Sequence, residues 1–572
     1  MTKRSGAELV VRALEAEGIA LAFGIPGTHN IELWDALASS DSVRSVLVTD
    51  EQSASFMADA AWRASGRMAC ANVVPGAGLT HAMSGVAEAF LDCVPMLVLG
   101  CGIRRDTGMA FQLHDVDQLA LARPVTKAQI RPARGEELYD AVRGACRIAR
   151  SGTPGPVFVE VPADQYLFRH EVEIGPQPHE EPAPPPSEAD VERAAEILAR
   201  ARRPLLYLGL GAARADVVAL AERLEAPVAT TFQGKGVFPE SHPLSLWPGF
   251  GDAAPAFARD VAASCDATLA IGCRFGEVAT GSYGMRPPAP LVHVDVDGSV
   301  PGRNVPTELA VAADAAAFVT ALLGRLEQRP SDEALRESIR EGRARAEEEM
   351  LRPSADRVSP HLLLRALSST FGPRTIFTSD SGNGTFLAVE GLRLDAPGRL
   401  LSPVDYSCMG YAVPAAIGAK LACPDAPVVA LAGDGAFLMT GFELLTAAEN
   451  GLGIAIFVLR DRELAQIAQF QATALGRKTA SALPDHDLGG LARALGAEAL
   501  ALGTDAGIAD AVARAKEIAG GGRPVLVDVA IDYSRKTFFT RGVVKTNFLR
   551  LPWGDRLRFV ARALARKVAG AR

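Results

Sequence analysis

Two aspartates in this 572-residue chain follow apolar runs and stand about 27 positions apart. Asp434 ends the run "VVALAGD", with Gly433 and Gly435 on either side, and Asp461 ends "GIAIFVLRD". Runs of this kind are typical of strands covered on both faces, and the interval between them fits a strand–helix–strand crossover. Parallel strands place their carboxyl ends side by side, where ligands of open α/β sheets bind. The spacing therefore predicts an oxygen-lined cation site.

Mg²⁺ suits such a pair of carboxylates, because it takes few protein ligands and completes its shell with phosphate oxygens and water. We expect the backbone carbonyl near Glu463 to be a third ligand. The flanking glycines leave room for a large ligand beside Asp434. Taken alone, either aspartate is equally well explained as a turn former or a helix N-cap, so the prediction depends on the pair.

Apolar strands alternate with helical stretches along the whole chain, which predicts an α/β protein of three doubly wound domains with parallel sheets. The basic tail ends in an amphipathic stretch that could touch a membrane surface or pack on the body or on a partner subunit. The predicted segments are a first domain (1–170), a Pro-rich linker (171–188), a second domain (189–328), a connector helix (329–357), a third domain (358–534) and the basic tail (535–572).

The composition, with 48% hydrophobic and 22% charged residues, is that of a soluble globular enzyme. A net charge of −8 argues against a general nucleic-acid partner. No run is long enough to span a membrane, and the charged N-terminal helix pattern differs from a signal peptide. The eight cysteines lack metal-binding spacing, which favours reduced thiols and a cytoplasmic location.

Together with "PVDYSCMGYAVPAAIGAK", the two aspartates resemble the thiamine-diphosphate-binding motif, which runs from GDG to an Asn or Asp after nearly this interval. Almost the whole chain is similar to the acetolactate synthase, pyruvate oxidase and benzoylformate decarboxylase superfamily, with its pyrimidine-binding, central and diphosphate-binding domains in that order. The resemblance implies thiamine diphosphate as the cofactor, with Mg²⁺ held by Asp434 and Asp461. It also implies cofactor-binding residues at Gly24, Pro26, Gly27, Gly76, Asn383, Gly384, Met409, Gly433 and Gly435.

Glu51 in "VTDEQSASFMADAAW" lies between a strand-like and an Ala-rich helical stretch. If thiamine diphosphate is bound, a carboxyl must hydrogen-bond the aminopyrimidine and help it lose a proton. Glu51 falls on the family's glutamate for this task, although Asp50 replaces the usual His. A glutamate in a first helical turn also has a purely structural explanation in the helix dipole. Gln112 matches a pocket-facing glutamine of the family and is the second predicted catalytic residue.

Three histidines, His29, His81 and His114, fall near the reaction chamber that this resemblance implies. Lone histidines are more often structural than catalytic, so their roles stay open.

The activity implied by the resemblance is decarboxylation of a 2-oxo acid followed by carboligation, as in acetolactate synthases. A simple decarboxylase that releases an aldehyde is the alternative, because Phe470 stands where synthases place a Trp that shapes the acceptor pocket. A third interpretation is a non-catalytic regulatory homologue. The presence of Glu51, Asp434 and Asp461 argues against it. A Rossmann dehydrogenase is disfavoured, since no GxGxxG opens a helix after the first strand.

The segment "GCRFGEVATG" lacks the acidic pair and the Arg that are common in FAD-bearing synthases, which argues against FAD. In the family, the pyrimidine-binding domain of one subunit faces the diphosphate-binding domain of another. The resemblance therefore implies a homodimer or homotetramer with its site at the subunit interface, a small 2-oxo acid as substrate, and no membrane partner.

Overall fold

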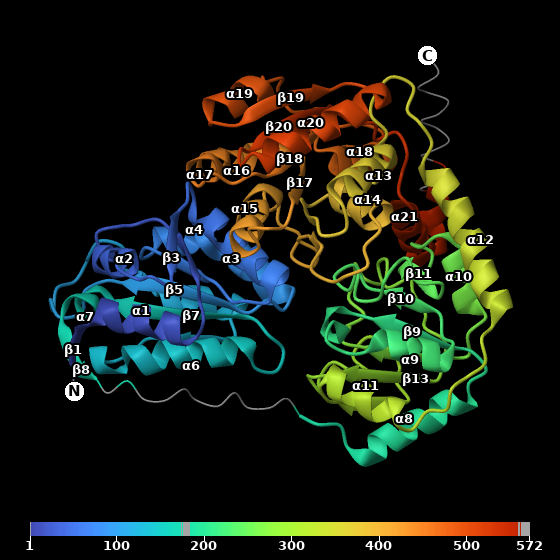
Figure 1. Cartoon of the computed structure of the whole chain (residues 1–572), viewed down its shortest axis with the longest axis horizontal. Helices are drawn as coiled ribbons and strands as arrows, with labels where there is room; N and C mark the ends of the chain where they lie inside the picture. The colour runs from blue at the N-terminus through green and yellow to red at the C-terminus, as the bar shows by residue number, and fades with distance from the viewer. Residues whose placement is uncertain (1, 173, 175–183, 559–560, 562–572) are drawn as a thin grey trace.

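The computed structural model describes residues 2–172, 174, 184–558 and 561, and it shows three α/β domains (Figure 1). Each domain contains one six-stranded sheet whose described strand pairs are parallel. This confirms the predicted fold class. Most of the Pro-rich segment predicted as a linker, and the last part of the basic tail, lie outside the described residues.

The first domain, blue to cyan in Figure 1, has helices on both faces of its sheet. In sheet order its strands are β3 (Arg44–Leu47), β2 (Leu21–Gly24), β4 (Cys70–Val73), β5 (Met96–Gly102), β7 (Pro156–Pro162) and β6 (Ala128–Ile130), with an antiparallel pair formed by β1 (Thr2–Ser5) and β8 (Arg169–Val172). Its helices are α1 (Gly6–Ala16), α2 (Ile31–Ala38), α3 (Glu51–Ser65), α4 (Ala77–Leu91), α5 (Gln118–Ala122), α6 (Leu138–Arg150) and α7 (Ala163–Leu167).

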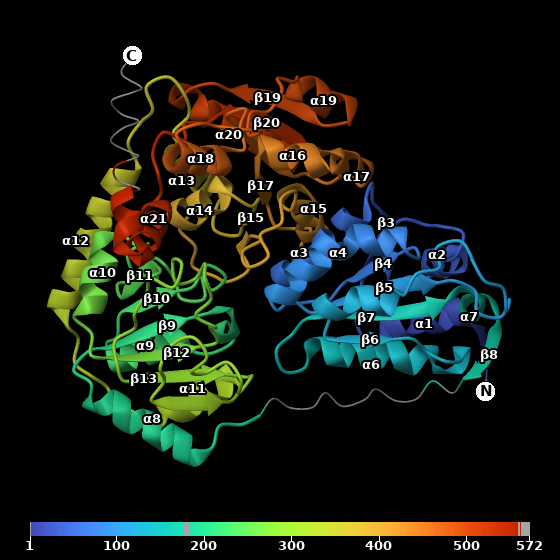
Figure 2. The same ribbon diagram turned by 180° about the vertical axis from the view of Figure 1, so that it is seen from behind.

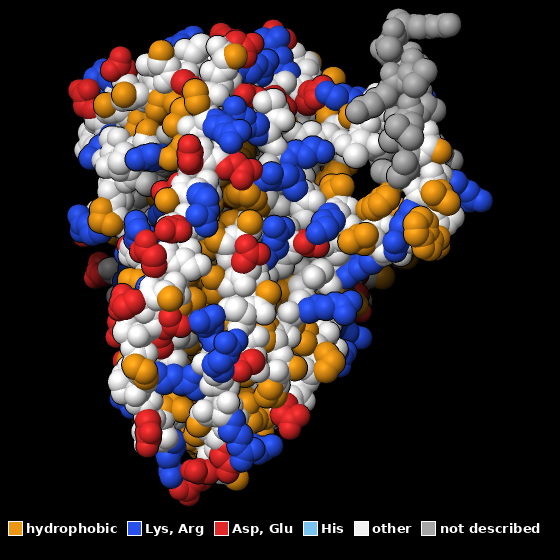
Figure 3. Space-filling view, turned by 90° about the vertical axis from the view of Figure 1, so that its right-hand side faces the viewer, with side chains coloured by type: hydrophobic (Ala, Val, Ile, Leu, Met, Phe, Trp, Pro, Cys, Tyr) orange, Lys and Arg blue, Asp and Glu red, His pale blue; other side chains and the backbone are white. Residues whose placement is uncertain are grey.

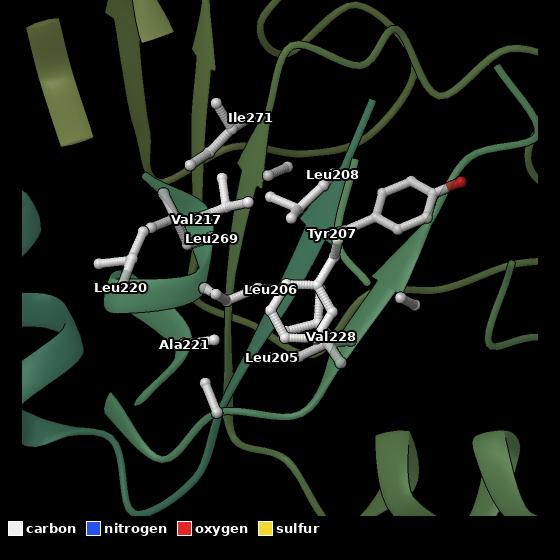
Figure 4. Packing of buried hydrophobic residues seen from close by; sticks show 14 of the residues in the cluster. Leu205, Leu206, Tyr207, Leu208, Val217, Leu220, Ala221, Val228, Leu269 and Ile271 are labelled. Atoms are coloured by element: carbon white, nitrogen blue, oxygen red, sulfur yellow. The ribbon is translucent and has the colours of Figure 1, made fainter. Parts of the chain in front are cut away.

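The central domain is drawn in green and has its own apolar core. Figure 4 shows side chains of β9, β12 and α9 packed together in that core. In sheet order its strands are β11 (Ser245–Pro248), β10 (Val228–Thr230), β9 (Pro204–Leu208), β12 (Ala267–Ile271), β13 (Leu291–Asp295) and β14 (Leu309–Ala312). Its helices are α8 (Glu188–Arg200), α9 (Val217–Leu224), α10 (Ala256–Ala263) and α11 (Ala315–Leu323).

The third domain, yellow to red in Figure 1, carries the two aspartates of the predicted cation site. In sheet order its strands are β16 (Leu400–Leu401), β15 (Ile376–Ser379), β17 (Val428–Gly433), β18 (Ala455–Arg460), β20 (Val525–Ala530) and β19 (Glu498–Leu502). Its helices are α13 (Pro360–Phe371), α14 (Asn383–Gly391), α15 (Ala412–Ala422), α16 (Asp434–Thr440), α17 (Leu444–Glu449), α18 (Ala465–Leu475), α19 (Leu488–Ala494) and α20 (Ile508–Gly520).

The first and third domains share one apolar core, because α3 packs directly on α15. The close approach requires a glycine: a Cβ at Gly418 would lie 2.3 Å from the backbone oxygen of Met57. On the opposite faces of the two sheets, α1 and α6 cover the first and α13 and α20 cover the third. The two domains that carry the candidate site residues are therefore packed directly against each other within one chain.

The charged stretch predicted as a connector forms α12 (Glu333–Met350), which lies along the outer side of the central domain in Figures 1 and 2. One face of this helix is buried, since Gly342 lies directly against Phe257 of α10. Figure 3 shows acidic and basic side chains interspersed over this side of the molecule. Within the described part of the chain, no helix is both long and apolar enough to cross a membrane.

Candidate active site

The carboxyl ends of β17 and β18 bring Asp434 and Asp461 to the same edge of the third sheet. Asp434 is the first residue of α16, directly after β17, and Asp461 directly follows β18. The two strands are hydrogen-bonded neighbours. The Asp434 carboxylate accepts hydrogen bonds from the backbone N–H of Arg462 at 2.8 Å and of Gly435 at 2.9 Å, so it lies against the residue that follows Asp461.

The two carboxyls are buried enough to disfavour their own charge. Burial raises the pKa of Asp434 above its usual range. Burial, and then the negative charge of Asp434, raises the pKa of Asp461 to about 6. A divalent cation would relieve both effects, because it replaces the lost hydration and cancels the repulsion. The two side chains therefore fit a bound Mg²⁺ ion.

The Glu463 side chain is already occupied, because Lys478 Nζ donates to its two carboxylate oxygens at 2.8 and 2.6 Å. Only the backbone near Glu463 is left as a third ligand, and that assignment stays a prediction. His486, which the sequence pattern did not single out, lies near Asp434 and favours its ionised form against the larger effect of burial.

The glycines around Asp434 have different surroundings. Around the Cβ position of Gly433 nothing lies within 4 Å, so its backbone borders open space. A Cβ at Gly435 would lie 2.7 Å from Leu464 Cδ2 and 3.8 Å from Met409 Cε. The structure thus brings Met409 to the edge that carries the aspartates. Gly433 leaves room for a ligand at this edge, whereas Gly435 permits close side-chain packing.

Asn383 and Gly384 begin α14, close to the segment that follows Asp461. The preceding residue, Gly382, has a φ of 103° that a side chain would strain. Its Cβ position is 3.5 Å from Oε1 of Gln466, in α18. The turn before α14 and the start of α18 therefore face each other at this end of the sheet.

Asp380 organises the backbone around Met409, a role that the sequence pattern did not reveal. It follows β15 and is buried. Its carboxylate accepts backbone hydrogen bonds from Ser381 at 3.0 Å, Gly410 at 2.8 Å and Ala412 at 3.0 Å. Burial raises the pKa of Asp380 to about 6, although these hydrogen bonds favour the ionised form. An aspartate after a strand was visible in the sequence, but two of its partners lie some 30 residues away.

Glu51 is the first residue of α3 and is only 6% exposed. Asp50 is the N-cap of that helix, since its side chain accepts a hydrogen bond from the backbone of Gln52 at 2.7 Å. His81, one turn inside α4, places Nδ1 3.5 Å from Glu51 Oε2 and 3.8 Å from Asp50 Oδ2. The three side chains thus form one cluster of possible ligand atoms, all within 4.8 Å of one another.

On another side, Gly78 of α4 leaves room for the carboxyl of Glu51. A Cβ at position 78 would lie 2.8 Å from Glu51 Oε1 and 2.8 Å from Val74 Cγ2. Any larger residue at position 78 would displace the Glu51 carboxyl from its present position. The proximity of Gly78 to Glu51 becomes visible only in three dimensions.

The glycines of the first domain lie in loops after β2 and β4. Gly24, before Pro26, ends β2, where a Cβ would be 2.0 Å from the backbone oxygen of Asn72 in β4. Gly27 donates its N–H to Asn30 Oδ1 at 2.7 Å. Gly76 has a φ of 63° and precedes α4. These contacts give Gly24 and Gly76 structural reasons to be glycine, and binding of the cofactor by them and by Pro26 and Gly27 stays a prediction.

Gln112 lies on an exposed loop after β5, where Nε2 donates to the backbone oxygen of Met109 at 3.2 Å. The same loop brings His114 to Gly76, whose Cβ position is 3.5 Å from the His114 backbone oxygen. The rings of His114 and His29 meet edge to face, with centroids 5.4 Å apart. Burial, and then the neighbouring His114, lowers the pKa of His29. A direct catalytic role for Gln112 stays a prediction.

The chain therefore contains two candidate half-sites: the Glu51 cluster and the aspartate edge. Within the described residues, no hydrogen bond or ion pair joins Glu51 or His81 to Asp434 or Asp461. The first and third domains are joined elsewhere, through the shared core of α3 and α15 and, among other contacts, through Thr49, whose N–H and Oγ1 donate to Glu443 Oε1 at 2.9 and 2.7 Å.

This order of three α/β domains has a known counterpart. Residues 4–121, 191–322 and 380–529 match, respectively, the N-terminal TPP binding domain, the central domain and the C-terminal TPP binding domain of thiamine pyrophosphate enzymes. The matches fall in order on the three sheets. Fold, site and domain matches thus define a thiamine pyrophosphate-dependent enzyme.

Similar proteins with curated names indicate which family within this class of enzymes the chain belongs to. The chain is 31% identical to a probable acetolactate synthase large subunit of Methanocaldococcus jannaschii over 83% of each chain. It is 30% identical to the acetolactate synthase isozyme 1 large subunit of Escherichia coli over 93% of this chain and 95% of the relative. It is 31% identical to the acetolactate synthase large subunit of Corynebacterium glutamicum over 92% of this chain and 87% of the relative. The chain belongs to the acetolactate synthase family of thiamine pyrophosphate enzymes, which confirms the resemblance.

Proposed function

We propose that this protein is an Mg²⁺- and thiamine-diphosphate-dependent enzyme that decarboxylates a 2-oxo acid and joins the remaining fragment to a second carbonyl compound. The proposal depends above all on the paired carboxylates at the ends of β17 and β18, inside the C-terminal TPP binding domain. The names of the relatives support acetolactate formation. The eight unpaired cysteines suit the proposed cytoplasmic location.

Thiamine diphosphate, when bound, supplies the nucleophilic carbon and the electron sink that allow CO₂ to leave. Asp434 and Asp461 would hold the Mg²⁺ that neutralises the diphosphate. Glu51 would hold and move the proton of the aminopyrimidine, a task suited to a carboxyl that is shielded from water and has room beside Gly78. Met409 would support the cofactor from the side of Gly435.

The two half-sites suggest that the complete site forms between two copies of the chain. Leu438, Met439, Phe442 and Leu445, on α16, α17 and the turn between them, are each at least 41% exposed in the single chain. Such a contiguous run of apolar side chains in solvent is typical of a subunit interface. It supports a homodimer, or a dimer of dimers, in which Glu51 of one copy serves the aspartates of the other.

The activity is tested by incubating pure protein with pyruvate, Mg²⁺ and thiamine diphosphate, and by measuring acetolactate and free aldehyde separately. Acetolactate as the main product supports the proposal. No CO₂ release across a panel of 2-oxo acids would refute it.

The shared site is tested by mixing Glu51→Gln and Asp434→Ala copies after subunit exchange. Half of the dimers should then be mixed, and each mixed dimer contains one intact site of two, so the mixture should regain about a quarter of wild-type activity. A mixture as inactive as its components would place both groups of each site in the same copy.

A second candidate is a simple 2-oxo acid decarboxylase that releases an aldehyde. It is favoured by Phe470 of α18, which is 40% exposed and replaces the Trp of the synthases. In the same assay, aldehyde without acetolactate would identify this activity.

A further inference from the structure

The central domain has the architecture of a nucleotide-binding domain. Its sheet is parallel, and the strand order reverses between β9 and β12, because β10 and β11 extend the sheet on one side and β13 and β14 on the other. In such sheets ligands bind in the crevice outside the carboxyl ends of the strands. The segments that border this crevice are the loops after β9, β10, β11 and β12.

A helix from the far end of the chain lies across these loops. This helix, α21 (Phe538–Arg550), is drawn beside β10 and β11 in both Figure 1 and Figure 2. After β10, Phe232 meets the ring of Phe539 at a centroid distance of 4.9 Å. Phe539 also stacks on Phe386 of α14, with centroids 4.4 Å apart and planes 26° from parallel. Its ring thus fills the junction between the central and third domains.

The loop after β11 is in direct backbone contact with α21. A Cβ at Gly542 would lie 2.3 Å from the backbone oxygen of Asp252 and 2.4 Å from Ala253 Cα. Lys545, one turn further along, donates to Asp252 Oδ1 at 2.8 Å. The helix therefore lies as close to this loop as a glycine allows.

The loop after β12 is covered by the last turns of the same helix. A Cβ at Gly284 would be 2.5 Å from Thr546 Oγ1. Asn547 Nδ2 donates to Ser282 Oγ at 3.5 Å. The guanidinium of Arg550 lies 5.8 Å from the ring centre of Tyr283. Three of the four loops that border the crevice thus contact α21.

The remaining loop, after β9, is packed against protein backbone. A Cβ at Gly209 would lie 2.0 Å from the backbone oxygen of Gly272, and a Cβ at Gly272 would lie 2.5 Å from Gly211 Cα. These glycines therefore have a packing role where the strand order reverses. A pocket beside Phe539, between α21 and the loops after β10, β11 and β12, has a volume of about 10 Å³. That is scarcely room for one water molecule.

Arg274, in the loop after β12, is likewise engaged by protein. Its Nη2 donates to Asp405 Oδ2 at 2.6 Å and to the backbone oxygen of Leu91. The guanidinium that follows the central strand is thus neutralised by an aspartate of the third domain.

We propose that α21 is the permanent occupant of the nucleotide crevice of the central domain, and that the protein binds no flavin or other dinucleotide there. The ring of Phe539 and the backbone around Gly542 take the space that such a ligand would need. The helix in turn connects the C-terminal part of the chain to both the central and the third domain.

Two measurements test this proposal independently of catalysis. In the first, the purified full chain is incubated with excess FAD and Mg²⁺, desalted, and examined for flavin absorbance. No retained flavin is expected. Flavin retained in a 1:1 ratio to protein would refute the proposal.

The second measurement is hydrogen–deuterium exchange of residues 538–550 in two glycine variants of the full chain. Gly542→Leu cannot be accommodated against the Asp252 backbone, so exchange of α21 should become roughly tenfold faster. Gly554→Leu is the matched control, because nothing lies within 4 Å of that Cβ position. Should Gly542→Leu fail to fold, Phe539→Ala gives the same readout by removing the stacked ring. Exchange of α21 that stays at the wild-type rate in the folded variant would overturn the assignment.

Discussion

The contact between Gly78 and Glu51 leads to a quantitative prediction for the variant Gly78→Ala. The added Cβ would lie 2.8 Å from Glu51 Oε1, about 0.6 Å closer than the 3.4 Å at which ordinary contact begins. Val74 Cγ2 would be equally close, and valine is stiff at χ1, so the new methyl group cannot gain room simply by moving toward Val74. The carboxyl must therefore move by several tenths of an ångström. If a displacement of 1 Å costs about 100-fold in rate, the expected loss in kcat is on the order of tenfold.

Stability should change little, because alanine is favoured over glycine inside a helix by roughly 0.5–1 kcal/mol, which offsets part of the strain. The affinity for thiamine diphosphate should also change little, since the diphosphate end is held by the third domain. The assay is CO₂ release from a 2-oxo acid at saturating cofactor, with cofactor affinity and melting temperature measured on the same samples.

The matched control is Gly144→Ala in α6, where the nearest atom to the new Cβ would be Arg147 Nη2 at 3.8 Å. This variant should keep wild-type kcat. Wild-type kcat in Gly78→Ala would show that the position of the Glu51 carboxyl does not limit turnover. A loss explained entirely by weaker cofactor binding would refute the reasoning equally.

Three further predictions concern single residues. Glu51→Gln should bind thiamine diphosphate normally but lose at least 100-fold in kcat, since an amide cannot relay the proton; comparable turnover would exclude Glu51 from the mechanism. Because the pKa of Asp461 is raised to about 6, protons should compete with Mg²⁺ for this carboxylate below that pH. Calorimetry should therefore show the affinity for Mg²⁺ falling about tenfold per pH unit below pH 6 and changing little above it. Lys235→Met should lower the free energy of unfolding in urea by about 3–5 kcal/mol because it leaves buried Glu240 unpaired, whereas Lys3→Met at an exposed pair should change it by less than about 1 kcal/mol; equal effects would contradict the burial argument.

The aspartate edge was predictable because its signal is local. A strand covered on both faces must be apolar, and a crossover has a characteristic length, so the positions of Asp434 and Asp461 along the chain already place them on neighbouring strand ends. The position of Glu51 at a strand–helix junction was visible for the same reason.

Other parts of the site have no local signature. His81 and Gly78 reach Glu51 from a different helix, and nothing in the spacing of 51, 78 and 81 specifies a 3.5 Å approach. The same holds for Asp380, whose backbone donors at Gly410 and Ala412 come from a distant segment. Such contacts depend on how helices pack over the sheets, which sequence periodicity does not encode.

The helical stretches likewise combine features that the sequence predicts with features that only the packing reveals. The charge pattern of α12 predicted a connector helix, and the structure adds that one face packs on the central domain through Gly342. The amphipathic stretch that ends the basic tail was expected to touch a membrane surface or to pack on the body or on a partner; it lies almost entirely outside the described residues, so that expectation stays a prediction. The location of α21, at the start of the tail, over the loops of the central sheet follows from the close contacts of Phe539 and Gly542.

The sequence alone indicated the three α/β domains and the placement of Asp434 and Asp461 on neighbouring strand ends, because both depend on residue types at short or regular intervals. The family followed from the resemblance of longer segments. Tertiary structure decided which side chains surround Glu51, which backbone groups surround Asp434, and that α21 packs on the loops after β10, β11 and β12 of the central domain. These features depend on shape complementarity between surfaces that are far apart in the chain. Whether two such surfaces can approach closely can depend on a single atom, for example on the absence of a Cβ in glycine.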